Sequence, residues 1–390
     1  MKKLATLLVA LVPYCLSAQN IWVADNNPNA PTGSHIFSTV QEAVNAASAG
    51  DIVQVQPSPY TYGNATIDKQ ITLVGIGFNL TKDLPLQSSM GDITLTNNAD
   101  NTSDADGTII KGLTLGILYV GANNGPSYTL ENVTVYNCKI NYVYSSTSYY
   151  PVDNFEIYNC YIFNSSNGII FYKKVTNTLI RNNLIIGSIE LRSSSAGTSN
   201  IITNNILYDG IYVVADGTYT QIVNNIFVGQ PGTESGFKSK LTHCIVGNNI
   251  FYGSTPSIGA SGSTSTNFQL NTFDYNLVYS TGDDTMPPTG GGVGNSGANN
   301  IVSSPDFLNV QLLNSWSSSY DFTLDSSVPS PAIDAGSDGT DMGITGGLHA
   351  WTDTNLILDP TAVPTIETLN TSTIINPGDD LPAHVKAKSN

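Results

Sequence analysis

Two of three consecutive strand-like segments in this 390-residue chain carry side chains that could do acid–base chemistry. These side chains are a carboxylate, a guanidinium and an amine. The segments read GIIFYKK from residue 168, SIELRSS from 188 and GIYVVAD from 210. Because side chains alternate along a strand, Glu190 and Arg192 should point outward, and Lys173 follows at a strand end. Arg192 or Lys173 could then abstract a proton while Glu190 acts as acid or ligand. The outward columns offer no second carboxylate that would complete a glycosidase pair.

Tyrosines accompany these charged residues. One predicted outward column holds Ile170, Glu190 and Tyr212, and the next holds Tyr172, Arg192 and Val214; Tyr142 and Tyr144 should lie on the preceding coil. Aromatic rings stack on sugar rings, while charged groups fix hydroxyls or uronates, so such a surface suits a glycan. The predicted glycan-binding residues are Tyr144, Tyr172, Glu190, Arg192 and Tyr212. The alternative is an exposed Glu190–Arg192 ion pair among tyrosines that are present for their strand propensity.

Two acidic stretches raise the question of a metal. The stretch DNTSDADG at 100–107 has Asp104 and Asp106 before a glycine, but it lacks the complete EF-hand pattern. In the second stretch, the carboxylates at 334, 338 and 341 could equally bind backbone N–H groups in Gly-rich turns. The four histidines, at 35, 243, 349 and 384, show no zinc spacing. We therefore predict no metal site or cofactor, with Ca²⁺ at either acidic stretch as the open alternative.

The elements that must position these residues come from a repeat. Paired polar residues recur every 20 to 27 residues, as in NTLIRNNLII, TSNIITNNIL and YTQIVNNIFV. A period of this length, with short β-rich segments, is typical of a solenoid. Two apolar columns flank the pairs and should point inward, one two residues before the pair (Val135, Ile157, Ile180, Ile202, Ile222, Val246, Phe273) and one two residues after it (Ile140, Ile162, Ile185, Leu207, Phe227, Phe251, Val278).

The second residue of each pair is interpreted as structural. An asparagine at a tight inward turn can bond both to the backbone and to the asparagine of the next coil. This predicts an internal ladder rather than a row of glycan-binding amides, formed by Asn183, Asn205, Asn225, Asn249 and Asn276.

Cysteines take the same position on two earlier coils. Cys138 and Cys160 should stack on adjacent coils at a separation that permits a disulfide, so a disulfide and two free thiols both remain open. Cys244 is expected to point inward as a small core residue. With Cys15 removed by the cleavage predicted below, three cysteines remain, and an odd number rules out a full disulfide framework.

The N-terminus and the charge indicate export. Residues 1–18 carry two lysines, the apolar run LATLLVALV and then CLSA, which is the pattern of a signal peptide. No later stretch is apolar enough to span a bilayer. Removing Lys2 and Lys3 changes the formal charge from −16 to −18, since 12 basic residues then face 30 acidic ones. Nucleic acid is therefore an improbable partner, and a polyanionic glycan would need a basic patch or Ca²⁺.

The stretch FSTVQEAVNAASAGDIVQVQPSPYTY predicts a short helix over 38–49 and then a strand. Ser38 and Gln41 would form its capping box, and Gly50 would end it. With the repeating pairs, this stretch resembles the start of right-handed parallel β-helix proteins of the pectin-lyase-like class, and SPAIDAGSDGTDMGITGG at 330–347 is similar to their closing segment. The resemblance covers roughly residues 21–350.

Enzymes of this class use either a Ca²⁺-binding carboxylate cluster with a basic proton abstractor or paired aspartates. With only Arg181 and Arg192 as arginines, this sequence favours binding over a lyase. The resemblance implies an all-β, right-handed parallel β-helix of about nine coils with an N-terminal capping helix.

The predicted organisation is a signal peptide at 1–18, the β-helix at 19–350 and a tail or edge strand at 351–390. Within it, 281–300 is expected to be a Gly- and Pro-rich loop. The leading functional hypothesis is a secreted or cell-surface protein that binds extended glycans without catalysis. A polysaccharide lyase or glycoside hydrolase, and a structural or adhesin scaffold, are the alternatives, and the oligomeric state stays open.

Overall fold

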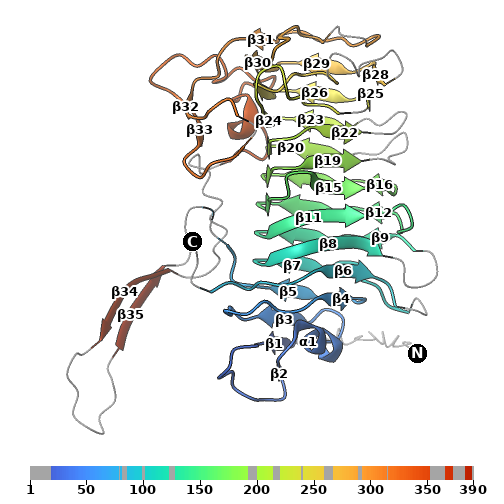
Figure 1. Cartoon of the computed structure of the whole chain (residues 1–390), viewed down its shortest axis with the longest axis vertical. Helices are drawn as coiled ribbons and strands as arrows, with labels where there is room; N and C mark the ends of the chain where they lie inside the picture. The colour runs from blue at the N-terminus through green and yellow to red at the C-terminus, as the bar shows by residue number, and fades with distance from the viewer. Residues whose placement is uncertain are drawn as a thin grey trace, which may run out of the picture.

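The computed structural model describes residues 19–351 except 79, 81–85, 99–101, 123–127, 192–199, 214–219, 239, 259–266, 289–291 and 314, together with residues 365–371 and 383–388. The predicted signal peptide lies outside the described residues, as does most of the chain beyond 351. Within these residues the chain forms a parallel β-helix of about nine turns with one α-helix near its N-terminal end, so the predicted fold class is confirmed (Figure 1).

Two long sheets run along the solenoid, and each coil adds a parallel strand to both. The 12-stranded sheet has the order β2 (Ile36–Phe37), β1 (Ile21–Ala24), β3 (Ile52–Val55), β5 (Thr72–Val74), β7 (Ile109–Lys111), β10 (Thr134–Tyr136), β13 (Glu156–Tyr158), β17 (Leu179–Arg181), β20 (Ile201–Thr203), β23 (Gln221–Val223), β26 (Ile245–Gly247), β29 (Thr272–Asp274). The 14-stranded sheet contains β4 (Ala65–Ile67), β6 (Ile93–Thr96), β8 (Thr114–Ala122), β11 (Lys139–Ser145), β14 (Tyr161–Ile162), β15 (Asn167–Phe171), β18 (Leu184–Ile185), β19 (Ser188–Leu191), β21 (Ile206–Leu207), β22 (Ile211–Val213), β24 (Ile226–Val228), β27 (Ile250–Tyr252), β30 (Leu277–Tyr279), β31 (Ile301–Val302).

Short strands complete the fold. Three pair in parallel, namely β9 (Leu130–Glu131), β12 (Val152–Asp153) and β16 (Val175–Thr176), and so do β25 (Leu241–Thr242) and β28 (Phe268–Gln269). Two antiparallel pairs follow the last coil, β32 (Phe307–Asn309) with β33 (Asp321–Leu324) and β34 (Thr365–Thr371) with β35 (Ala383–Lys388). No helix in the described part of the chain is long and apolar enough to cross a bilayer.

Helix α1 (Val40–Ala46) is shorter than the predicted 38–49, and it ends at the C-cap Ala47 rather than at Gly50. The predicted capping box of Ser38 and Gln41 is wrong, because Thr39 is the N-cap and Glu42 is its partner. The Thr39 side chain accepts from the Glu42 N–H at 3.2 Å, and Glu42 accepts from the Thr39 N–H at 3.2 Å. This register points Val40, Ala43 and Val44 into the first coil, where all three are buried.

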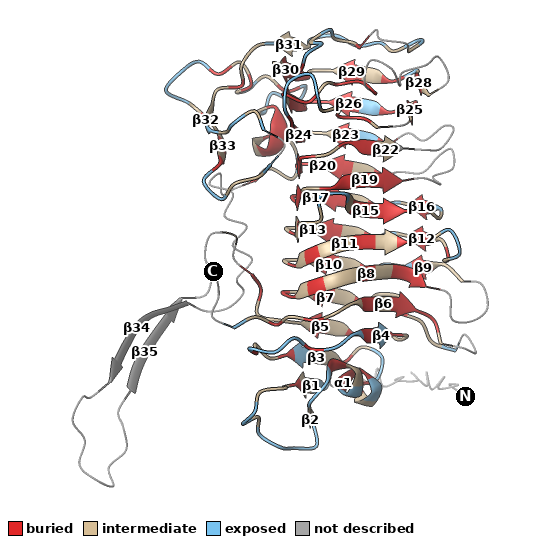
Figure 2. Cartoon of the chain, viewed as in Figure 1, coloured by how far each residue is buried: buried red, intermediate tan, exposed pale blue. Residues whose placement is uncertain are grey.

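The interior of the solenoid is one continuous apolar core (Figure 2). Both predicted inward columns are confirmed, since each of their members is at most 1% exposed. Like residues stack on like across parallel pairs, for example Ile180 opposite Ile202 in β17 and β20. Each coil therefore buries its inner side chains only because the coils on both sides cover them.

The asparagine ladder is confirmed. Each ladder residue is fully buried, and its backbone N–H and its Nδ2 both donate to the Oδ1 of the next asparagine, as from Asn205 to Asn225 at 3.0 Å each. Nδ2 also donates to a carbonyl of the preceding coil, as from Asn225 to Ile202 at 2.9 Å. The ladder continues to Asn300, which accepts from Asn276 at 2.9 Å.

In four of the pairs the first asparagine binds a distant segment of the chain instead of the ladder. Asn182, Asn204, Asn224 and Asn248 have φ between 53° and 56°, and their side chains face outward. There they hold residues 305–351, which we call the C-terminal cover. Nδ2 of Asn204 donates to the carbonyls of Ile344 at 3.1 Å and Gly346 at 2.8 Å.

The C-terminal cover packs on the outside of the coils rather than on their end. A second apolar cluster lies beneath it, in which an outward column of the 14-stranded sheet meets Phe322, Met342 and Trp351 of the cover. Each column residue is at most 1% exposed, and the column consists of Leu184, Ile206, Ile226, Ile250 and Leu277.

The last coil corrects another expectation. Residues 281–300 were predicted to be a loop, but their second half completes a coil. Val293 bridges Gln269, Ser296 bridges Thr272, and Asn295 and Asn300 extend two ladders. Glycine content was misleading, because positions 294 and 297 have positive φ and serve the turns of this coil.

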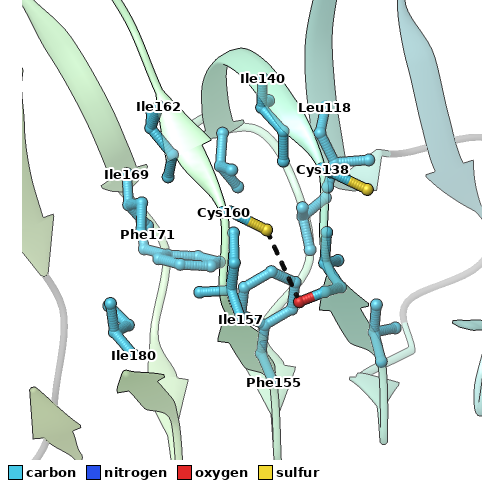
Figure 3. Close-up of a cluster of buried hydrophobic side chains, with 14 of the residues drawn as sticks. Leu118, Cys138, Ile140, Phe155, Ile157, Cys160, Ile162, Ile169, Phe171 and Ile180 are labelled. Atoms are coloured by element: carbon cyan, nitrogen blue, oxygen red, sulfur yellow. Dashed lines mark hydrogen bonds between the residues drawn. The ribbon is translucent and has the colours of Figure 1, made fainter. Parts of the chain in front are cut away.

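Cys138 and Cys160 are free thiols within the core. Figure 3 shows both sulfurs among isoleucine and phenylalanine side chains of neighbouring coils. Burial, followed by the neighbouring Cys138, raises the pKa of the Cys160 thiol well above its usual value. Cys244 is 1% exposed, as predicted for a small core residue.

Candidate functional site

Five half-buried tyrosines gather on the outer face of the 14-stranded sheet, and we call them the tyrosine surface: Tyr119, Tyr142, Tyr144, Tyr149 and Tyr172. Strands β8 and β11 position the first three, because Tyr119 lies directly opposite Tyr144 in their parallel register. Tyr172 follows β15, whose Phe171 pairs with Ser145. Tyr149 comes from the loop after β11.

Tyr144 is the centre of this group. Its ring centroid lies 5.6 Å from that of Tyr172, 6.1 Å from Tyr119, 6.2 Å from Tyr142 and 6.4 Å from Tyr149. All four pairs are edge-on, with interplanar angles of 77° to 87°. In an edge-on pair the edge of one ring meets the face of the other, so none of these four pairs is stacked face to face.

A second row of aromatic residues lies on the 12-stranded sheet, and the faces of its rings are covered by one another and by basic side chains. Tyr136 and Tyr158 stack face to face at 4.9 Å and 2°. The Arg181 guanidinium lies 3.9 Å from the outer face of Tyr158, and Lys111 lies over Tyr136 at 5.8 Å. Arg181 also binds Glu156 through Nε and Nη2, both at 2.8 Å. Because both faces of both rings are covered, this row stabilises the sheet and offers no stacking surface.

The structure brings only some predicted site residues together. Tyr144 and Tyr172 are in contact, and Lys173 lies beside them with its Nζ donating to the Thr147 carbonyl at 3.0 Å. Glu190 is on the predicted outward face but is only 5% exposed, so the expected exposed carboxylate is wrong. Arg192 lies outside the described residues.

Tyr212 is separated from the tyrosine surface. It occupies the register position of Tyr144, but the rungs of Ile170 and Glu190 come between them. Near Tyr212, the Lys238 Nζ binds the Asp209 carboxylate at 2.6 Å. The five residues predicted to bind glycan therefore do not form one surface, because Tyr212 is separated from Tyr144 and Tyr172. Their role in glycan binding stays a prediction.

Sequence reasoning missed three residues of this region: Tyr119, Tyr149 and Asp92. Burial raises the pKa of Tyr119, and the nearby Asp92 carboxylate raises it further. Asp92 also contributes to the raised pKa of Tyr142, after burial and Tyr119. A sequence signal existed, because TLGILYVGA at 114 alternates apolar and other residues and could have been aligned with KINYVYS at 139.

The acidic stretches form local hydrogen bonds. Asp104 Oδ1 accepts from the Asp106 N–H at 3.1 Å, and Asp338 Oδ1 accepts from Thr340 N–H at 3.1 Å and Oγ1 at 2.7 Å. Asp341 Oδ1 accepts from the Asp334 N–H at 3.0 Å. Nowhere in the described ranges do three or more His, Cys, Asp or Glu side chains form a group that could hold a metal ion.

Asp106 leads to a prediction about pH. Burial, with Asp104 and Glu131 nearby, raises the pKa of Asp106 to about 6, although the Glu131 N–H donates to it at 2.7 Å. The folded state thus holds a proton that the unfolded state releases, so stability decreases as pH rises through about 6. Asp106→Asn should stabilise the protein at neutral pH, by no more than about 1 kcal/mol because the side chain is half exposed, and not at pH about 4. Denaturant midpoints at both pH values measure this.

Asp338→Asn is the control of opposite sign. The Thr340 hydroxyl holds the pKa of Asp338 below its usual value, so its loss should lower the midpoint at neutral pH. Equal midpoints for Asp106→Asn and the unchanged protein at neutral pH would contradict the assigned burial cost.

One protein family is similar to part of this chain. The profile of a family described as periplasmic copper-binding protein (NosD) matches residues 44–233, which is slightly less than half of the chain. The matched region extends from α1 past β24 and contains the tyrosine surface. A search of curated proteins finds no match.

The described thiols and two of the described methionines are too deeply buried to offer copper an open site. Copper takes thiolate, thioether and imidazole ligands. The three described thiols are each at most 1% exposed in apolar surroundings, and Met90 and Met342 are 4% and 0% exposed. In the part of the chain that the structure describes, no three or more His, Cys, Asp or Glu side chains come together to hold a metal ion.

Proposed function

We propose that this protein acts outside the cytoplasm as a non-catalytic binder of extended glycans, which lie on the tyrosine surface. The observation that carries the proposal is the convergence of four half-buried tyrosines around Tyr144, which is half-buried itself. Rings of this kind offer apolar faces to sugar rings and hydroxyls to sugar hydroxyls. Export is supported by the signal-peptide pattern at 1–18 and by the periplasmic description of the similar family.

Three features favour binding over polysaccharide cleavage. Glu190, the predicted acid, is buried. Lys173, a predicted proton abstractor, already donates to a carbonyl. Asp92 lies near two of the rings, but a cleavage mechanism of the kind known in this fold needs a carboxylate cluster with a base or a pair of carboxylates. Copper transport is not favoured, because the described thiols are buried and no three or more described His, Cys, Asp or Glu side chains form a group that could hold the metal.

Tyr144→Ala tests the proposal most directly. Removing the central ring takes away stacking area and loosens four neighbouring rings, so binding should weaken about tenfold or more. Binding of the full chain to a panel of neutral and uronic polysaccharides, by affinity electrophoresis and then calorimetry, measures the change. Tyr60→Ala is a matched control, because Tyr60 is 56% exposed and lies near the N-terminal end of the solenoid.

The outcomes separate the alternatives. Retained binding in Tyr144→Ala, with its fold intact, would reject the site. Absence of binding by the unchanged protein to every polysaccharide would reject the function and favour a structural scaffold. Release of new reducing ends, with Ca²⁺ or with chelator, would identify an enzyme and redirect mutagenesis to Lys173, Glu190 and Arg192.

A further inference from the structure

The arrangement of the rings on the tyrosine surface, together with a neighbouring carboxylate, narrows the class of ligand that the surface could bind. At one register position, Thr94, Tyr119 and Tyr144 follow one another on β6, β8 and β11. On the next rung Ile170 takes the register position of Tyr144, and Tyr172 follows two residues later, with its ring 5.6 Å from that of Tyr144. The rings are therefore arranged along the solenoid axis, from coil to coil.

The spacing of these rings suits a polymer. Successive strands lie about 4.8 Å apart, and the ring centroids of neighbouring rungs are 6.1 Å and 5.6 Å apart. The rise of one pyranose unit in an extended chain is similar to this step. A glycan lying along the axis can thus place successive sugars on successive rungs.

A carboxylate marks one end of the series. Asp92 lies two residues before Thr94, so both face outward, while Ile93 between them is buried in the core. The Asp92 Oδ1 accepts the Ile117 N–H at 2.8 Å, and Ile117 is the register partner of Tyr142. This bond fixes the carboxylate beside the columns of Tyr119 and Tyr142. No hydrogen bond among the described residues involves the second oxygen of Asp92, Oδ2.

The negative charge of Asp92 acts electrostatically on two of the tyrosines. It contributes to the raised pKa of both Tyr119 and Tyr142, which places a negative charge within electrostatic range of both hydroxyls. The whole chain carries a formal charge of −16. A uronate at this end would meet repulsion, whereas sugar hydroxyls would donate to the carboxylate.

We propose that the tyrosine surface binds a neutral glycan whose chain runs along the solenoid axis, and that Asp92 is a specificity-determining residue that accepts hydrogen bonds from sugar hydroxyls beside Tyr119. This rests on the proposed function and adds to it the class of ligand, the direction of the chain and a recognition residue.

Asp92→Asn tests the class of ligand. The asparagine keeps an oxygen that can accept the Ile117 N–H, so the fold should persist, but it loses the charge. Binding of a neutral glucan, mannan or xylan should weaken about tenfold, which is the scale of one hydrogen bond to a charged acceptor, while polygalacturonate binding should not weaken. Asp325→Asn is the control, because Asp325 Oδ1 makes an equivalent bond to the Ser327 N–H at 2.8 Å on the C-terminal cover.

Two tyrosine variants test the direction. If the chain runs along the axis, Tyr119→Ala and Tyr172→Ala, on either side of Tyr144, should each weaken neutral binding. Unchanged binding in Tyr172→Ala would overturn the axial direction. Stronger binding of polygalacturonate than of every neutral glycan, or unchanged neutral binding in Asp92→Asn, would overturn the neutral class. Each of these leaves glycan binding itself intact, whereas binding to no glycan at all rejects the proposed function.

Discussion

Replacing Asn225 by alanine should destabilise the solenoid by about 3 kcal/mol or more, because each buried polar group left without a partner costs about 1–3 kcal/mol. Its Oδ1 accepts the N–H and Nδ2 of Asn205, both at 3.0 Å. Its Nδ2 serves the carbonyls of Ile202 and Val223 and the Oδ1 of Asn249. Asn225 is fully buried, so water cannot replace these partners.

Denaturant unfolding followed by circular dichroism measures the effect. Asn29→Ala is the control for the amide itself, since Asn29 is exposed in the loop between β1 and β2. Because solenoid coils stabilise mainly their neighbours, we expect the coils of β20, β23 and β26 to unfold first, so that the transition broadens rather than shifting uniformly. Equal midpoints for the two variants would show that the ladder does not hold the coils together.

The second large effect is expected at the C-terminal cover. Phe322 is 1% exposed and packs in the outer cluster, with its ring 5.4 Å from Phe307. Phe322→Ala should cost about 3–5 kcal/mol, the usual range for truncating a buried phenylalanine. Because the cover is a separate layer, this loss should loosen it and expose the apolar column beneath, while the solenoid keeps its strands.

Limited proteolysis and binding of a hydrophobic dye test this local effect. We expect cleavage within 305–351 and increased dye fluorescence, with little change in the circular dichroism of the coils. Leu308→Ala is the matched control, since Leu308 belongs to the same segment but is 53% exposed. Loss of the whole β-sheet signal in Phe322→Ala would show instead that cover and solenoid unfold as one unit.

The repeat made the solenoid predictable because its signal is local and recurs. Alternation along each strand settles which side chains point inward, and stacking of like residues follows from parallel pairing. The inward columns, the inward Cys244 and the ladder from Asn183 to Asn276 were all correct for this reason. The helix cap was missed by one residue, because Ser38 and Thr39 are both good N-caps and the sequence alone does not choose between them.

Long-range contacts decided what the outer face does. The first asparagine of a pair shows this, because Nδ2 of Asn204 donates to the carbonyl of Gly346, 142 positions away. A signal was present: apolar residues follow the pair at both the first and second positions, as in NNLII and NNILY, which indicates a strand covered on both faces. The sequence did not say which segment would cover it.

The same distinction between local sequence pattern and long-range packing applies to the candidate site. Local alternation placed Tyr144, Tyr172 and Glu190 on the outer face, and that much the sequence by itself determined. Only the tertiary structure decided that Glu190 is buried there while Tyr144 gathers four other rings, because exposure depends on which distant segments lie above a strand. The period of a strand determines the direction in which a side chain points, whereas packing between coils and across the cover determines what it meets.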